Sequence, residues 1–298
     1  MMRSKKFFTR AIVSGMLALA VFLSSNISSA QGADSVRDKQ SQSTKMQAGE
    51  HAGMKTIGLI GGMSWESSII YYQLINVDVK ARLGGLHSAK SVMYSVDFAT
   101  IVPLQREGNW AELDEKMIAA ARHVEAGGAD FIVICTNTMH KSAEAIEKNV
   151  HIPLLHIADV TAEQVKAAGL NKVGLLGTQF TMEDDFYKNR LINKYGLEVI
   201  VPTEQERKDI HRIIFDELCV GKIKPESRQR YREIMNHLVQ RGAQGIILGC
   251  TEIGLLVGEK DSSVPLFDTA KIHAAAAVAY ALEGTDPTPN AKSTRQHH

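Results

Sequence analysis

The residues best suited to do chemistry are two cysteines, Cys135 and Cys250, which stand in matching surroundings. Each follows a short apolar run, FIVI or IILG, and each is followed by a threonine. Such runs are typical of buried strands, and parallel α/β sheets bind ligands beyond the carboxyl ends of their strands. There the N–H groups of a following helix lower the pKa of a thiol below its free value of about 8.5. We therefore expect both thiols to be reactive.

Two reactive thiols on opposite sides of one pocket would suit the inversion of a carbon centre. Inversion removes a proton from one face of the carbon and delivers another to the opposite face. One thiolate and one thiol can share this work and exchange roles, while nearby donors stabilise the charge that develops. We expect Cys135 and Cys250 to be the catalytic pair, and the sequence offers four short donors beside them: Thr136, Asn137, Thr138 and Thr251.

The alternative is that these cysteines are small buried hydrophobic residues, a common role for a free thiol. Inert packing does not require matching positions, so the pair argues against it. Cys219 has no counterpart and is expected only to pack. The sequence has no C-x-x-C or H-x-x-x-H spacing, so we expect no metal site and structural roles for His140 and His156.

Strand-like and helical segments alternate along the chain, which predicts an α/β fold with parallel sheets and helices on both faces. The clearest helical patterns cover Trp110–Ala126 and Ser227–Arg241. The clearest strands are Thr56–Ile60, Ser91–Val96, Phe131–Ile134, Lys172–Leu176, Glu198–Val201 and Gly245–Leu248.

Three motifs recur in the same order, which indicates a duplicated α/β unit. KTIGLIGG is echoed by KVGLLGTQ, GGADFIVICT by RGAQGIILGCT, and IPLLHIAD by VPLFDTA. The separations of matched residues are 116 for Gly58 and Gly174, 115 for Cys135 and Cys250, and 112 for Pro153 and Pro265. We predict two doubly wound lobes related by a pseudo-two-fold axis, one from 54–158 plus 268–284 and the other from 159–267.

The ends of the chain are expected to lie outside this fold. Residues 1–30 combine a basic start, an apolar run and small residues before Ala30, as in a cleavable signal peptide. The run Ala11–Leu23 is short for a membrane span, so we expect a periplasmic or secreted protein without stable membrane insertion. We expect residues 31–53 to be a flexible lead-in and 285–298 a disordered tail. A net charge of +1 gives no sign of a nucleic-acid surface.

The segment from Gly61 to Glu66 follows the first strand and suggests close approach of backbone to a small ligand. It lacks the Lys-Ser/Thr of a phosphate loop and does not fit the dinucleotide fingerprint. Ser64 could contact the substrate or simply cap a helix.

The motifs GLIGGMSWES, GGLHSA, CTNTMH, LGTQFTM and GCTEIGLL resemble those of the aspartate/glutamate racemase family, in order, from about Lys55 to Leu282. The motifs are more similar to those of the broad-specificity branch than to those of the dedicated aspartate racemases. The resemblance implies catalysis by Cys135 and Cys250 without pyridoxal phosphate or another cofactor. It implies that Thr136, Asn137 and Thr138 hold the α-carboxylate of the substrate.

The resemblance also places Lys208 where aspartate racemases carry a lysine for the side-chain carboxylate, although Lys208 could equally be a solvated charge. Those enzymes also use an arginine after an early strand. The corresponding segment here, Ala89 to Gln105, contains no arginine, and Gln105 is a possible neutral substitute for it. The remaining expected substrate-binding residues are Met63, Ser64, Thr178, Thr251 and Glu252.

We therefore expect a racemase or epimerase of free amino acids that favours aspartate or glutamate, with broader or uncharged substrates as the alternative. A homodimer is one possible assembly. A hydantoin racemase or a decarboxylase of the same superfamily is a second enzyme hypothesis. A periplasmic amino-acid-binding protein also combines a signal peptide, two α/β lobes and an amino-acid ligand, but binding alone does not call for two symmetric cysteines.

Overall fold

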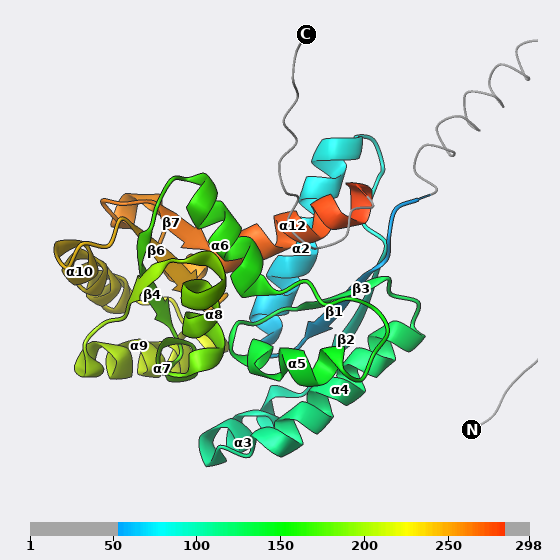
Figure 1. The fold of residues 1–298 in the computed structure, drawn as a ribbon, viewed down its shortest axis with the longest axis horizontal. Helices are drawn as coiled ribbons and strands as arrows, with labels where there is room; N and C mark the ends of the chain where they lie inside the picture. The colour runs from blue at the N-terminus through cyan, green and yellow to red at the C-terminus, as the bar shows by residue number, and fades with distance from the viewer. Residues whose placement is uncertain (1–52, 284–298) are drawn as a thin grey trace, which may run out of the picture. The chain divides into compact units, whose positions relative to one another are not determined.

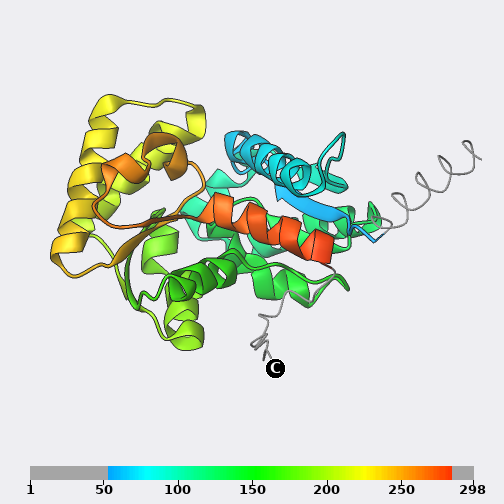
Figure 2. The same cartoon turned by 90° about the horizontal axis from the view of Figure 1, so that it is seen from above.

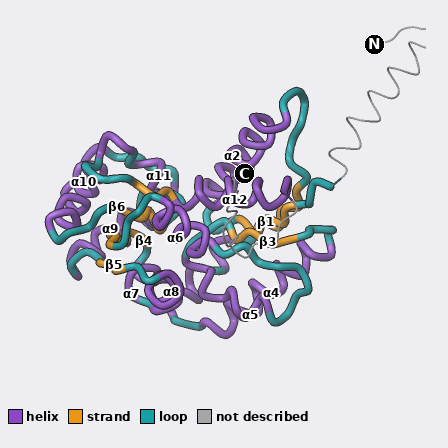
Figure 3. The backbone as a smooth tube through the Cα atoms, turned by 45° about the horizontal axis from the view of Figure 1, so that its top comes forward, coloured by secondary structure: helices purple, strands orange, loops and turns teal. Residues whose placement is uncertain are grey.

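Short apolar runs form two parallel sheets in the computed structural model, which describes residues 53–283. The first sheet has the order β2-β1-β3 and the second the order β5-β4-β6-β7 (Figures 1 and 3). Their strands are β1 (Ile57–Gly61), β2 (Ser91–Ser95), β3 (Phe131–Ile134), β4 (Lys172–Gly177), β5 (Glu198–Ile200), β6 (Gly245–Gly249) and β7 (Leu266–Asp268). The predicted α/β fold with two parallel sheets is confirmed.

Helices cover both faces of each sheet. The α-helices are α2 (Trp65–Leu83), α3 (Val102–Glu107), α4 (Trp110–Ala126), α5 (Ala143–Glu147), α6 (Ile157–Ala167), α7 (Gln179–Glu183), α8 (Asp185–Tyr195), α9 (Glu204–Asp216), α10 (Pro225–Gln240), α11 (Ile253–Leu256) and α12 (Thr269–Glu283). Short 3₁₀ turns are η1 (Phe98–Thr100), η2 (Thr138–Ser142), η3 (Leu218–Val220) and η4 (Glu259–Asp261). None of the described helices is long and apolar enough to cross a membrane.

Local chemistry explains where the main helices begin. Ser64 caps α2 by accepting a hydrogen bond from the N–H of Ser67, and Asn109 caps α4 in the same way. Thr203 and Glu206 form a reciprocal capping box at the start of α9. These caps satisfy N–H groups that the first turn leaves unpaired.

The fully apolar strands bury both faces, as expected for parallel sheets covered by helices. β1, β3 and β6 are buried along their whole length. We call the first sheet with its covering helices the first lobe, and the second sheet with its helices the second lobe. The last helix, α12, leaves β7 of the second sheet and packs against α2 beside the first (Figure 2).

The two sheets repeat one pattern of backbone pairing. Gly58 pairs with Ile132 in the first sheet, and the matched Gly174 pairs with Ile246 in the second. The N–H of Ile132 donates to the carbonyl of Pro153, and the N–H of Ile246 donates to that of Pro265. The equivalent of Ile132 is therefore Ile246, which lies 114 residues later.

This register corrects the sequence alignment of the two cysteines by one residue. Continued past the last paired residues, Ile134 and Gly249, the offset of 114 makes Thr136 the equivalent of Cys250 and Gly249 the equivalent of Cys135. Because neighbouring residues along a strand point to opposite faces, a slip of one residue changes which side chain faces a ligand.

The six predicted strands are all present, and each end lies within one residue of its prediction. The prediction of Trp110–Ala126 matches α4, while α10 begins two residues earlier than expected and ends one residue earlier. β7 was not predicted as a strand. The sequence showed only that the segment containing it, VPLFDTA, resembles the segment IPLLHIAD around Pro153. The predicted signal peptide and tail lie outside the described residues, as does almost all of the lead-in.

Candidate active site

A cavity lies where the carboxyl ends of strands from both sheets meet. Its volume of about 20 Å³ leaves room for roughly one water molecule, so an amino acid needs the cavity to widen. The residues that line it are Met63, Phe98, Gln105, Thr136, Asn137, Thr138, Thr178, Ile214, Phe215, Cys219, Gly249, Cys250 and Glu252.

Cys250 follows β6 directly, lines this cavity and is 7% exposed. Its Sγ donates a hydrogen bond to Oε2 of Glu252 at 2.9 Å. Burial, and then the neighbouring Glu252 carboxyl, raise the pKa of the Cys250 thiol well above its ordinary value. Cys250 is therefore a protonated thiol at neutral pH, with a proton acceptor already in contact.

Glu252 is 2% exposed and is held from both lobes. Its Oε1 accepts a hydrogen bond from Oγ of Ser64 at 2.8 Å, and its Oε2 accepts one from Oγ1 of Thr251 at 2.9 Å. A second bond between the lobes joins Oγ of Ser67 to Oγ1 of Thr251 at 2.7 Å. The hydroxyls of Ser64 and Thr251 thus fix the carboxyl of Glu252 beside the thiol.

Cys135 does not face the cavity, contrary to the expectation from sequence. It is 1% exposed and packs in an apolar cluster with Leu59, Tyr71 and Val133. Its Sγ has only a long contact of 4.0 Å, with the carbonyl of Val133. Burial raises the pKa of the Cys135 thiol far above its ordinary value.

Thr136, the next residue, lines the cavity in place of Cys135. The reason is the one-residue register: Thr136 occupies the position in the first lobe that Cys250 occupies in the second. The cavity is therefore lined by a thiol from one lobe and, at the equivalent position of the other lobe, a hydroxyl.

A polar group of residues forms another part of the wall. Oγ1 of Thr138 and Oγ1 of Thr178 lie 2.9 Å apart and join the two lobes. Nδ2 of Asn137 donates to Oγ1 of Thr269 at 2.9 Å, while Oδ1 of Asn137 is buried without a partner. These hydroxyl and amide groups are suited to bind the carboxylate and ammonium of an amino acid.

Ser64, Thr251 and Lys208 do not line the cavity. Ser64 and Thr251 contact Glu252 and so act through it. Lys208 is exposed on α9, where its Nζ pairs with Glu204 at 2.6 Å. The other predicted substrate-binding residues all line the cavity: Met63, Gln105, Thr136, Asn137, Thr138, Thr178 and Glu252.

Sequence reasoning missed four lining side chains: Phe98, Ile214, Phe215 and Cys219. Phe98 of η1 and Phe215 of α9 stack across the two lobes with ring centroids 6.3 Å apart. No motif marked these apolar residues. Cys219, expected only to pack, lies close enough to Glu252 for that carboxyl to raise the pKa of the thiol, after burial as the larger cause.

His140 supports the backbone of Thr136 from behind the cavity. Its Nδ1 lies 2.8 Å from the carbonyl of Thr136, and its Nε2 accepts a hydrogen bond from the N–H of Ile157. Because Nε2 is the acceptor, Nδ1 carries the proton and donates to Thr136. Burial, the largest cause, holds the pKa of His140 well below its usual range, so the ring stays neutral.

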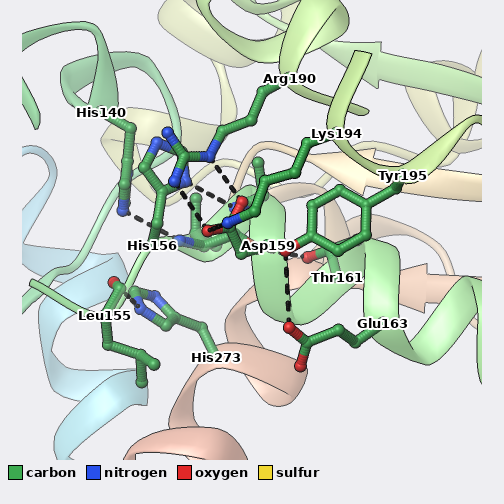
Figure 4. A network of polar contacts seen from close by, with 12 residues as sticks. His140, Leu155, His156, Asp159, Thr161, Glu163, Arg190, Lys194, Tyr195 and His273 are labelled. Carbon is green, nitrogen blue, oxygen red and sulfur yellow. Dashed lines mark hydrogen bonds and ion pairs between the residues drawn. The ribbon is translucent and has the colours of Figure 1, made fainter. Parts of the chain in front are cut away.

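A charged cluster stabilises the same wall (Figure 4). Asp159 of α6 binds Arg190 and Lys194 of α8, with Nζ of Lys194 2.7 Å from the carboxylate. His156 packs on His140 with ring centroids 4.7 Å apart. Among the described residues, no group of three or more His, Cys, Asp or Glu could hold a metal ion.

Known proteins are similar to this chain in sequence and in fold. The family model described as Asp/Glu/hydantoin racemase matches residues 60–277. The chain is 24% identical over 219 residues to the broad specificity amino-acid racemase RacX of Bacillus subtilis, a match that covers 72% of this chain and 92% of that protein.

Two crystal structures are similar as well. One is a Yersinia pestis protein described as a candidate Asp/Glu racemase, which is 55% identical in sequence and superposes with a TM-score of 0.72. The match covers 77% of this chain and 100% of the Yersinia pestis chain. The other is an aspartate racemase homologue from Pyrococcus horikoshii, which is 35% identical and superposes with a TM-score of 0.65. That match covers 76% of this chain and 99% of the Pyrococcus horikoshii chain. Together with the two-lobed fold and its cavity, these matches show that the chain belongs to the Asp/Glu/hydantoin racemase family.

Proposed function

We propose that this protein is a cofactor-independent racemase of free amino acids in which Cys250 and Thr136 exchange protons with the two faces of the α-carbon. The observation that carries the proposal is the equivalence of these residues in the duplicated lobes, with both lining one cavity. Equivalent positions about a pseudo-two-fold axis approach a bound carbon from opposite sides.

The first step is transfer of the Cys250 thiol proton to the carboxylate of Glu252. The thiol already donates to Oε2 of Glu252, and the positive ammonium of a substrate lowers the cost of forming a thiolate in a buried site. The thiolate then removes the α-proton of the enantiomer that faces it.

The second step delivers a proton to the other face of the carbon. The hydroxyl of Thr136 donates it, which leaves the α-carbon inverted, the Cys250 thiol protonated and Thr136 as an alkoxide. The cycle closes when the alkoxide takes a proton from solvent and the Glu252 carboxyl releases the proton that it took from Cys250. The reverse direction runs through the same states, with Thr136 as base and Cys250 as acid.

The polar wall orients the substrate for both steps. Thr138 and Thr178 offer hydroxyl donors to the α-carboxylate, where charge accumulates as the α-proton leaves. Oδ1 of Asn137, which has no protein partner, accepts from the substrate ammonium.

The experiment is α-proton exchange in D₂O, with chiral chromatography of the products. The purified protein is incubated separately with L- and D-amino acids. A racemase produces the opposite enantiomer carrying deuterium at the α-position. An amino-acid-binding protein returns the ligand unlabelled, and a decarboxylase releases the amine; either result contradicts the proposal.

We further propose that the protein is exported and cleaved near Ala30, on the strength of the N-terminal sequence. Intact-mass measurement of protein from the periplasm or medium should then give a chain beginning near Gln31. A chain that retains Met1 in the cytoplasm would contradict export.

A further inference from the structure

We propose that the cavity selects amino acids with uncharged side chains, and that Gln105 is the residue that sets this specificity. The inference rests on the proposed racemase function and adds the class of substrate. It is carried by what lines the cavity next to the polar wall.

The part of the cavity left for a substrate side chain is largely apolar. Phe98 comes from η1 in the first lobe, and Ile214 and Phe215 come from α9 in the second. Met63, which is 4% exposed, completes this surface. Aliphatic carbons of a substrate gain from contact with these groups.

No lysine or arginine is among the described residues that line the cavity. Glu252 is the one carboxylate among them. A substrate carboxylate would therefore be buried without a cation and close to an acidic group, which costs several kcal/mol by general estimates for unpaired buried charges. Aspartate and glutamate are disfavoured for this reason.

Three cations on the elements that surround the cavity are engaged in ion pairs. Lys208 is exposed and pairs with Glu204 at 2.6 Å, and Arg207 pairs with Glu183 at 2.7 Å. Lys141 pairs with Asp184 at 2.6 Å. Moving any of them into the cavity would break an existing ion pair.

Gln105 of α3 lines the cavity and offers it a neutral hydrogen-bonding group. It is 4% exposed, and its Nε2 bonds only to Sδ of Met139 at 3.2 Å. A thioether is a weak acceptor. Oε1 of Gln105 is buried without a partner.

A buried carboxamide with unused hydrogen-bonding capacity is costly unless a ligand satisfies it. Gln105 can accept from and donate to a neutral polar group, so a carboxamide or hydroxyl at the end of a substrate side chain fits. Specificity of this kind follows from polar groups that only the right substrate pairs.

The test compares substrates that differ in charge but hardly in shape. We expect kcat/KM for glutamine and asparagine to exceed those for glutamate and aspartate by about 100-fold, the scale of discrimination by one mismatched group. Equal or higher kcat/KM for the acids would overturn the inference and leave the racemase proposal standing. Absence of exchange with every amino acid would overturn both.

Variants of Gln105 make the assignment specific. Gln105→Arg places a cation in the cavity and should raise kcat/KM for glutamate relative to glutamine by at least about tenfold. Gln105→Met, similar in length but without hydrogen-bonding groups, should lose the preference for glutamine over methionine. Exchange of alanine, whose side chain has no polar group to pair with position 105, is the measure of folding and basal catalysis in each variant. An unchanged glutamate-to-glutamine ratio in Gln105→Arg, with alanine exchange retained, contradicts the role of Gln105.

Discussion

At the scale of single residues, the proposed chemistry depends on which of two neighbours faces the cavity. Cys135 packs among apolar side chains, while Thr136 and Cys250 both line the cavity. A hydroxyl is a far weaker acid than a thiol, so the two proton-transfer groups are not matched in pKa. General acid–base catalysis is most efficient when such groups have pKa values near the working pH.

Thr136→Cys should therefore speed racemisation. The new thiol can donate and accept the α-proton more readily than the hydroxyl, and we expect kcat to rise by at least about tenfold. The measurement is the initial rate of racemisation with each enantiomer. Thr136→Ser serves as the control, because it keeps a hydroxyl and should stay close to the parent. A slower Thr136→Cys enzyme with parental stability would argue against proton transfer at this position.

At the scale of elements, the sequence predicted the strands well because buried parallel strands are short, continuous apolar runs. It did not predict the register between the duplicated halves. The two cysteines are chemically conspicuous and lie 115 residues apart. The strands that precede them are offset by 114 residues, because Gly58 pairs with Ile132 and the matched Gly174 pairs with Ile246. The apolar lining residues Phe98 and Phe215 carry no motif, so only tertiary structure could identify them.

Buried histidines tie η2, α6 and α12 together and should make stability depend on pH. Burial lowers the pKa of His273 to about 4, below the value of about 6.5 expected in the unfolded chain. The stability that neutral His273 contributes is complete above pH 6.5 and is lost as the pH falls from 6.5 toward 4.

For His273 alone we expect the free energy of unfolding to fall by about 2 kcal/mol between pH 7.5 and pH 5. Urea denaturation at both values measures the change. His273→Gln should reduce the difference between the two pH values, whatever its effect on stability at pH 7.5. His151→Asn, at a highly exposed histidine, is the matched control. Equal pH dependence in parent and His273→Gln would refute the assignment.

At the scale of the whole molecule, catalysis requires the cavity to open and close. The cavity is too small for an amino acid, and it is closed by contacts between the lobes, including Ser64 with Glu252 and Thr138 with Thr178. Phe98 and Phe215 stack across the same junction.

Phe98→Ala should favour the open state, since an aromatic pair contributes about 0.5–1.5 kcal/mol beyond its buried area. We expect Cys250 to be alkylated about two- to tenfold faster than in the parent, as followed by peptide mass spectrometry. Tyr72→Ala, at an exposed position on α2, should leave the rate unchanged. Parental alkylation in Phe98→Ala would mean that the aromatic pair does not hold the cavity closed.

The most direct test of the proposed proton transfer compares two adjacent substitutions, Cys135→Ser and Thr136→Val, in the same racemisation assay. Cys135→Ser should stay within about tenfold of the parental kcat/KM once corrected for folded protein, because Cys135 is not among the residues that line the cavity. Thr136→Val, which keeps the shape but removes the hydroxyl, should lose at least about 100-fold. Loss of activity in Cys135→Ser together with its retention in Thr136→Val would contradict the assignment of Thr136 and restore the cysteine pair.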